Sequence, residues 1–277
     1  MKKRRGKDMI FEIVMIAIVI LMFYPILMII NMSLKTDMEV TLSPLTLPSV
    51  FQWSNYKQAF EQMGFLGCIK NSVLITALTT AVGTFLYCIA SYGIVRVPRY
   101  KKLFRLIYAL FIGGMILPSQ STLIPLLWFY KAIRLSNTYT GIVLLYTAGS
   151  AAFSIMLVTG FINTVPISLE EAARIDGCNP FGVFFKIVFP LLKPIISTLI
   201  IINAIGVWND FYNPLFFLSG KNSKTITLGV YMFRGEHMTQ WNILFAGLVL
   251  ATLPMMIVYF LLQKNIIAGM AAGSVKS

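Results

Sequence analysis

Residues 166–190 read PISLEEAARIDGCNPFGVFFKIVFP, a compact charged insert between two long apolar runs. The charged side chains of this insert are Glu170, Glu171, Arg174, Asp176 and Lys186. Charged groups are strongly disfavoured inside a bilayer, so we interpret the insert as a segment that faces water between two membrane spans. A polar segment of this kind is a candidate contact surface for another protein.

Local signals within the insert predict two short helices separated by a turn. Ser168 and Glu171 have the spacing of a capping box, in which each side chain accepts a hydrogen bond from a backbone N–H of the first helical turn. Gly177 is suited to the left-handed conformation that ends a helix. Asn179 and Pro180 then predict a second helix, with Asn as the N-cap and Pro in the first helical position.

The insert also carries a spaced motif. Glu171-Ala172-Ala173 is followed by three residues and Gly177, then by nine residues and Ile187, then by one residue and Phe189-Pro190. This spacing resembles the EAA loop of binding-protein-dependent ABC importers, E-A-A-x3-G-x9-I-x-L-P, with Phe189 in place of the usual Leu. In that family the loop is the coupling helix, which sits in a cleft of a cytoplasmic ATPase subunit.

The resemblance implies which residues couple this chain to an ATPase: Glu170, Glu171, Ala172, Ala173, Asp176, Gly177 and Pro190. The small side chains among them would let this helix and turn approach another protein closely. The alternative is an amphipathic cytoplasmic loop with no docking role.

The composition is that of an integral membrane protein. The chain has 277 residues, of which 57% are hydrophobic and 12% charged, and its mean hydropathy is +0.78. Several apolar runs reach the ~20 residues that a helix needs to cross a bilayer. We expect an all-α polytopic protein with six transmembrane helices near residues 10–33, 71–95, 104–127, 139–163, 191–217 and 243–263. The first of them is read as an uncleaved span.

Basic residues are distributed asymmetrically across these spans. With the N-terminus inside, the inner segments hold 15 of the 23 Lys and Arg residues, and the excess is largest in the first two. Such an excess marks the cytoplasmic side. The net charge of +13 is therefore explained by the orientation of the spans in the membrane and does not indicate nucleic-acid binding. Both termini and the 166–190 insert are expected in the cytoplasm, and the chain in the cytoplasmic membrane of a bacterium.

The third predicted span is interrupted by two prolines. Pro118 and Pro125 bracket a polar stretch that contains Gln120. Two prolines should kink or break the helix, and broken backbone at membrane depth is tolerated only inside protein or beside a wet cavity. Gln120 is thus a candidate for a translocation path, and a hydrogen-bonded kink between helices is the alternative.

The fourth and fifth predicted spans each carry a polar stripe. Tyr146, Ser150 and Ser154 share one helix face, and they could line a path or bond a neighbouring helix. Asn203, Gly206, Asp210 and Asn213 fall within an arc of roughly 80° if the fifth span is one continuous helix. This stripe is predicted to face the path, with Trp208 and Tyr212 on the opposite side. The alternative places Asp210 at the outer interface, where it caps or pairs locally.

Two further segments resemble carbohydrate-importer permeases. Residues 208–215 read WNDFYNPL, similar to a W-N-x-F-x-x-P-L stretch that follows the EAA loop in that group, which adds Asn209 to the candidates for the path. The C-terminus resembles the ending F-x-x-x-Q-(x5–7)-G-x-x-x-G-x-x-K, with Gln263, Gly269, Gly273 and Lys276 at matching positions. By resemblance, this tail reaches the ATPase pair.

The resemblance extends from the first span to the tail and is strongest to the smaller permease of the maltose importer group. It implies the type I ABC importer permease fold. The expected domains are residues 1–70 (first helix and extracytoplasmic segment), residues 71–265 (core permease domain) and residues 266–277 (cytoplasmic tail).

The implied partners are a second permease, two ATP-binding subunits, an extracytoplasmic solute-binding protein, lipid and a sugar. The outer loop 218–242 is a candidate contact for the binding protein. A permease for another solute and a secondary transporter remain alternatives.

Catalytic signatures are missing from the sequence. It contains no G-x-x-x-x-G-K-[ST] phosphate loop, one histidine, and three scattered cysteines that form no metal-ligand pattern. We therefore expect no enzyme activity, metal or cofactor in this chain, with ATP and Mg²⁺ bound by partner subunits.

Overall fold

The computed structural model describes residues 2–97, 101–218, 220, 223–235 and 239–274. The secondary structure in these residues is helical, apart from an isolated β-bridge between Arg234 and Thr239. The chain divides into two compact units, Met1–Cys68 with Leu228–Met256 and Ile69–Thr227 with Ile257–Ser277.

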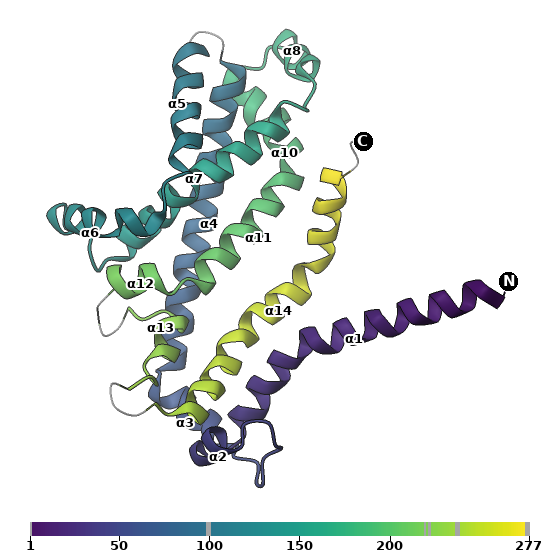
Figure 1. Ribbon diagram of the computed structural model, residues 1–277. Coiled ribbons are helices and arrows are strands. Elements are labelled where there is room, and N and C mark those ends of the chain that lie inside the picture. The colour runs from purple at the N-terminus through teal and green to yellow at the C-terminus, as the bar shows by residue number, and fades with distance from the viewer. Residues whose placement is uncertain (1, 98–100, 219, 221–222, 236–238, 275–277) are drawn as a thin grey trace. The chain divides into compact units, whose positions relative to one another are not determined.

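The first unit contains the N-terminal helix and the segment that follows it (Figure 1). Its helices are α1 (Lys2–Ser33), α2 (Asp37–Leu42) and α3 (Ser54–Gln62), with most of α13 (Ile226–Tyr231) and the beginning of α14 (Trp241–Ser274). The segment after α1 folds around the buried Lys35, whose Nζ donates to the carbonyls of Ser43 at 2.7 Å and Pro44 at 3.2 Å.

A capping box fixes the first turn of α2. The Thr36 hydroxyl accepts a hydrogen bond from the Glu39 N–H, and the Glu39 carboxylate accepts one from the Thr36 N–H. The Ser49 hydroxyl also donates to this carboxylate. The bonds from Ser49 and from the Thr36 backbone lower the pKa of Glu39 from 4.5 to about 2, because they stabilise the ionised form.

The second unit holds the charged insert. Its helices in chain order are α4 (Phe65–Arg96), α5 (Lys101–Gly114), η2 (Ser119–Thr122), α6 (Leu123–Ala132), α7 (Tyr139–Ile162), α8 (Ile167–Ile175), α9 (Pro180–Gly182), η3 (Val183–Val188), α10 (Phe189–Leu191), α11 (Lys193–Asn209) and α12 (Tyr212–Phe217). Helix α7 packs against both α5 and α11 (Figure 1). Val158, Ile162, Val183 and Leu199 are fully buried in a core that joins α7, η3 and α11.

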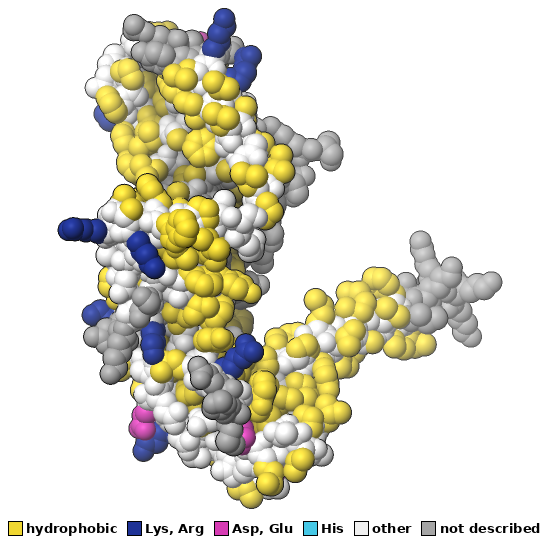
Figure 2. Space-filling model, turned by 60° about the vertical axis from the view of Figure 1, so that its left-hand side comes forward, with side chains coloured by type: hydrophobic (Ala, Val, Ile, Leu, Met, Phe, Trp, Pro, Cys, Tyr) yellow, Lys and Arg dark blue, Asp and Glu magenta, His cyan; other side chains and the backbone are white. Residues whose placement is uncertain are grey.

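Large apolar side chains cover much of the surface. Figure 2 shows hydrophobic side chains, in yellow, exposed over much of the face in view. Among the described residues, the helices that are long and apolar enough to cross a membrane are Phe11–Ser33, Phe65–Arg96, Tyr139–Ile162 and Trp241–Val258. A bent pair, Pro180–Leu191 and Lys193–Asn209, would make a fifth span, with an angle of 71° between its parts.

The break predicted in the third span is confirmed. Helix α5 ends at Gly114, Pro118 precedes the short 3₁₀ helix η2, and Pro125 lies in the first turn of α6. A proline in a first turn is tolerated because that position needs no intrahelical N–H donor. The predicted segment 104–127 therefore consists of separate helical pieces.

The prediction that the fifth span is one helix over residues 191–217 is wrong. Helix α11 ends at Asn209, and Asp210 has an extended conformation with φ −71° and ψ 133°. In a continuous helix the residue at 214 would donate to the carbonyl of Asp210, but Pro214 has no N–H and its ring would clash there. The Asp210 carbonyl instead accepts a hydrogen bond from the Thr227 hydroxyl at 2.9 Å.

Candidate functional site

The insert begins its first helix earlier than the capping box predicted. Helix α8 starts at Ile167, Pro166 occupies the N-cap position, and no side chain caps this end. Ser168 and Glu171 therefore lie inside the helix, where both are exposed. The prediction of a capping box is wrong because Pro166 already supplies the extended residue from which a helix can start, and its carbonyl accepts from the Leu169 N–H.

The glycine that ends α8 adopts the predicted conformation. Gly177 has φ +84°. The N–H of Cys178 donates to the carbonyl of Ala173 at 2.9 Å, and the N–H of Gly177 donates to that of Arg174 at 3.1 Å. This pair of bonds is a Schellman motif, which satisfies the last carbonyls of the helix. The predicted left-handed helix end is confirmed.

The second short helix also begins as predicted. Asn179 is the N-cap, its Oδ1 accepts a hydrogen bond from the N–H of Gly182 at 2.7 Å, and Pro180 occupies the first turn. The chain then continues as the π-helix η3 and turns sharply into α11. Pro194 contributes to this turn because it has no N–H for the carbonyl of Pro190.

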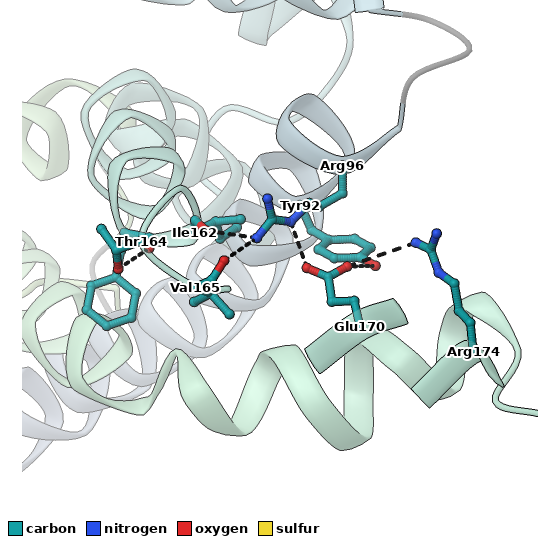
Figure 3. Close-up of polar contacts among 8 residues, drawn as sticks. Tyr92, Arg96, Ile162, Thr164, Val165, Glu170 and Arg174 are labelled. Atoms are coloured by element: carbon teal, nitrogen blue, oxygen red, sulfur yellow. Dashed lines mark hydrogen bonds and ion pairs between the residues drawn. The ribbon is translucent and has the colours of Figure 1, made fainter. Parts of the chain in front are cut away.

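Glu170 is the buried anchor of α8 (Figure 3). Its Oε1 accepts a hydrogen bond from Arg96 Nε at 2.6 Å, and its Oε2 accepts one from the Tyr92 hydroxyl at 3.0 Å. Arg174, one turn further along α8, approaches Oε2 at 4.0 Å from a half-exposed position. Both carboxylate oxygens are therefore occupied, mainly by side chains from α4.

The guanidinium of Arg96 reaches a third element. Its Nη2 donates to the carbonyls of Ile162 at 3.1 Å and Val165 at 2.7 Å, at the end of α7 and just beyond it (Figure 3). The last carbonyls of a helix have no intrahelical donor, so an arginine there fulfils a capping role. The sequence reasoning used Arg96 only for topology and missed its role here. Tyr92 and Arg96 lie one turn apart at the end of a span, which was the available signal.

The seven predicted coupling residues divide into an inner and an outer group. Glu170 is fully buried and Ala173 is 6% exposed. The exposed group is Glu171, Ala172, Asp176, Gly177 and Pro190. Ile175 and Phe181 add large apolar side chains to this surface, with exposed fractions of 87% and 77%. The outer group thus presents small, acidic and apolar groups together.

A cavity of about 850 Å³ lies among α6, α7, α11 and α12. Its lining contains six of the seven predicted path residues: Tyr146, Ser150, Asn203, Asn209, Asp210 and Asn213. Neither Trp208 nor Tyr212 belongs to this lining; Trp208 is buried elsewhere and Tyr212 is exposed. Gln120 instead lines a second cavity of about 890 Å³ between α5 and α7, which shares the wall residues Thr122, Ala148, Gly149 and Phe153 with the first.

The carboxylate of Asp210 is hydrogen-bonded to neighbouring groups at the edge of the first cavity. It lines the cavity, and its Oδ2 accepts hydrogen bonds from the Tyr146 hydroxyl at 2.9 Å and from Asn213 Nδ2 at 2.6 Å. Its Oδ1 accepts from the N–H of Tyr212 at 3.0 Å. The side chain therefore caps the break between α11 and α12 locally, and much of its acceptor capacity is already used.

The predicted tail contacts are only partly described. Gly269 and Gly273 lie within helix α14, whereas Lys276 lies outside the described residues. In the predicted outer loop 218–242, residues 219, 221–222 and 236–238, which include His237, also lie outside them. The roles of these segments stay predictions.

Comparison with known proteins gives a family match over most of the second unit. Residues 89–272 match the family model of the binding-protein-dependent transport system inner membrane component. The "Probable ABC transporter permease protein YurM" of Bacillus subtilis is 36% identical, over 91% of this chain and 83% of that protein. The "Melibiose/raffinose/stachyose import permease protein MelC" of the same species is 33% identical, over 92% of this chain and 91% of that protein.

A solved structure has the same fold across the chain. It is a bacterial ABC transporter involved in the import of the acidic polysaccharide alginate, and the two chains superpose with a TM-score of 0.81 at 21% sequence identity. The superposition covers 95% of this chain and 98% of the other.

Proposed function

Because this chain belongs to the family of binding-protein-dependent transport system inner membrane components, and is thus the permease subunit of an ABC importer, we propose how it works and what it carries. Its proposed solute is a sugar or an oligosaccharide. The observation that carries this proposal is the pairing of a largely exposed charged helix, α8, with a cavity among the same bundle of helices whose wall includes hydroxyl, amide and carboxylate side chains. Relatives named for sugar import support the solute class.

The proposed topology has six spans with both termini in the cytoplasm. The pieces α5, η2 and α6 together make the third crossing, and α11 with α12 makes the fifth. Both interruptions fall where polar groups line cavities, as broken backbone at membrane depth requires. The excess of basic residues in the inner segments supports this orientation, in the cytoplasmic membrane of a bacterium.

The proposed partners follow from the division of labour in this family. A second permease completes the path, two ATPase subunits bind ATP and Mg²⁺, and an extracytoplasmic binding protein delivers the solute. The exposed residues of α8 and its turn form the docking surface for an ATPase subunit. Closure of the ATPase pair can move this chain only if α8 has different contacts in the two states, since equal affinity shifts no equilibrium.

The cavity supplies groups suited to a carbohydrate. Hydroxyl and amide side chains such as Ser150, Asn203 and Asn209 can donate to and accept from sugar hydroxyls, and apolar wall residues such as Phe153 and Leu126 can pack on the less polar ring faces. Asp210 is proposed to shape the path by holding the helix break, with a smaller share in contacting solute.

Two measurements on the complex test this proposal. The tagged chain, extracted in mild detergent, should co-purify an ATP-binding subunit, which a secondary transporter would not. Proteoliposomes containing the complex and its binding protein should take up sugars from a panel of melibiose, raffinose and maltotriose, but not methionine. Recovery of the chain with no ATPase subunit would refute the proposed docking, and uptake of methionine alone would refute the sugar class.

A further inference from the structure

We propose that Arg96 and Glu170 are positioning residues that fasten α8 to helices α4 and α7, so that displacement of α8 is transmitted to the cavity walls. This inference rests on the proposed docking of α8 to an ATPase subunit. It adds a specific mechanical connection inside this chain, made by a buried ion pair.

The first observation is how α8 is held to α4 in particular. The buried residues of α8 are Glu170 and Ala173. Ala173 belongs to the core that contains Val183 and Val188, so this side of α8 packs on η3. The remaining surface of α8 is available for docking. Contact between α8 and α4 therefore depends chiefly on the Glu170 carboxylate, which the Arg96 guanidinium meets at 2.6 Å.

The second observation is the geometry of the guanidinium. Arg96 donates to α8 through Nε and to the end of α7 through Nη2, while its own backbone belongs to α4. A guanidinium is planar and rigid, so its donors fix the relative positions of the groups they contact. The N-terminal half of α7 carries Tyr146 and Ser150, which belong to the cavity wall. One side chain thus joins the docking helix to the helix that lines the cavity.

The third argument concerns the contribution of a buried ion pair to the free energy of folding. Replacing both members of a buried ion pair by apolar residues is often neutral or even stabilising, whereas removing one member is strongly destabilising. A pair that served stability alone would therefore be replaceable. A pair that transmits movement would not be, because apolar side chains supply contact without directional bonds.

The experiment uses the ATP-dependent accessibility of the cavity, which requires no knowledge of the solute. Cys68, Cys88 and Cys178 are replaced by Ser, and Ser150→Cys is introduced as a probe in the cavity wall. The complex is purified through this chain together with its ATPase subunits. The labelling rate by N-ethylmaleimide is then measured with and without ATP and vanadate, which trap the ATPase.

The decisive variant is the double substitution Arg96→Met with Glu170→Met. We expect this variant to insert and to retain the ATPase subunit. The ratio of the labelling rates with and without trapping should be about tenfold smaller than in the unmodified chain, which is within the range that coupling between sites usually spans. The matched control is Thr164→Val. Thr164 also bonds a carbonyl of the last turn of α7, that of Phe161 at 2.8 Å, but it is exposed and has no bond to α8 (Figure 3). It should respond to trapping as the unmodified chain does.

The outcomes separate the two proposals. A double variant that responds to trapping like the control would overturn the positioning role. No response in the unmodified chain would instead count against the proposed function. If the double variant fails to insert, Arg96→Lys decides, because lysine keeps the charge but cannot reach Glu170, Ile162 and Val165 in the fixed geometry of a guanidinium. A normal response in that variant would overturn the inference, and a lost response would support it.

Discussion

Gly177 allows backbone strain and docking space to be separated by experiment. Its φ of +84° is a conformation that disfavours any residue with a Cβ, by roughly 1–2 kcal/mol. A Cβ built at this position has nothing within 4 Å, so the chain itself leaves room for a side chain. The penalty of Gly177→Ala within this chain is therefore strain alone. Asparagine tolerates the left-handed region better than alanine but is larger.

The two effects predict opposite orders for these variants. If the turn only has to fold, Gly177→Asn should perform better than Gly177→Ala. If the turn fits closely into an ATPase subunit, the larger side chain should be worse, and Gly177→Trp worst of all. We predict that binding of the ATPase subunit decreases in the order Gly177→Ala, Gly177→Asn, Gly177→Trp. About 1 kcal/mol of strain corresponds to a loss of roughly fivefold in the docked population for alanine, with a larger loss for the bulkier residues.

The assay measures the amount of ATPase subunit that co-purifies with each membrane-inserted variant. Gly64 provides a matched control, because it also has a positive φ, of +63°, and open space around a Cβ, but it precedes α4 in the other unit. Gly64→Asn should insert and retain the ATPase subunit fully. Normal retention by Gly177→Trp, or better retention by Asn than by Ala, would refute docking through this turn.

Three further predictions concern topology, the cavity and the segment after α1. Ile175→Cys should react with a membrane-impermeant maleimide only in permeabilised cells, because the proposed topology places the exposed side of α8 in the cytoplasm; labelling of intact cells would contradict that topology. Asp210→Ala should lower solute uptake about tenfold, since it leaves the Tyr146 hydroxyl without its charged acceptor, and unchanged uptake would show that the helix break needs no carboxylate. Glu39 has a lowered pKa, so its contribution to stability is present above its ordinary value of 4.5 and is lost as pH falls toward about 2. Proteolysis of loop 36–50 should accelerate as the pH falls through that window. The Glu39→Gln variant should be cleaved at neutral pH as fast as the unmodified chain is cleaved at low pH. Cleavage of the unmodified chain at a rate independent of pH would refute this assignment.

Features set by a few adjacent residues were predictable from the sequence. The left-handed end at Gly177, the N-cap at Asn179 and the break near Pro118 were all predicted, and all are present. Each depends on a steric or hydrogen-bonding property of the residue itself. Asn203 and Asp210 were predicted to face a translocation path, and that role stays a prediction. Both residues line one cavity, although the helical arc used in the argument was wrong because α11 ends at Asn209.

Features that depend on distant partners were not predictable in the same way. Ser168 and Glu171 had the spacing of a capping box, but the helix start at Ile167 places them inside the helix. The motif directed attention to Glu171, while the carboxylate that anchors α8 belongs to its neighbour Glu170. No pattern of spacing distinguishes the two acids. Glu170 is buried and Glu171 is exposed because only one side of this short helix packs against another element.

The sequence by itself determined that this chain crosses a membrane, that a charged helix and turn interrupt its spans, and where that turn bends. Apolar length, the distribution of basic residues and glycine or proline chemistry act locally, so they can be read in order along the chain. Only the tertiary structure decided that Arg96 bonds a carboxylate 74 residues away and two carbonyls, one in the last residue of α7 and one just after it. Such partners meet because packing brings the ends of α4, α7 and α8 together, and that packing depends on the whole set of helices.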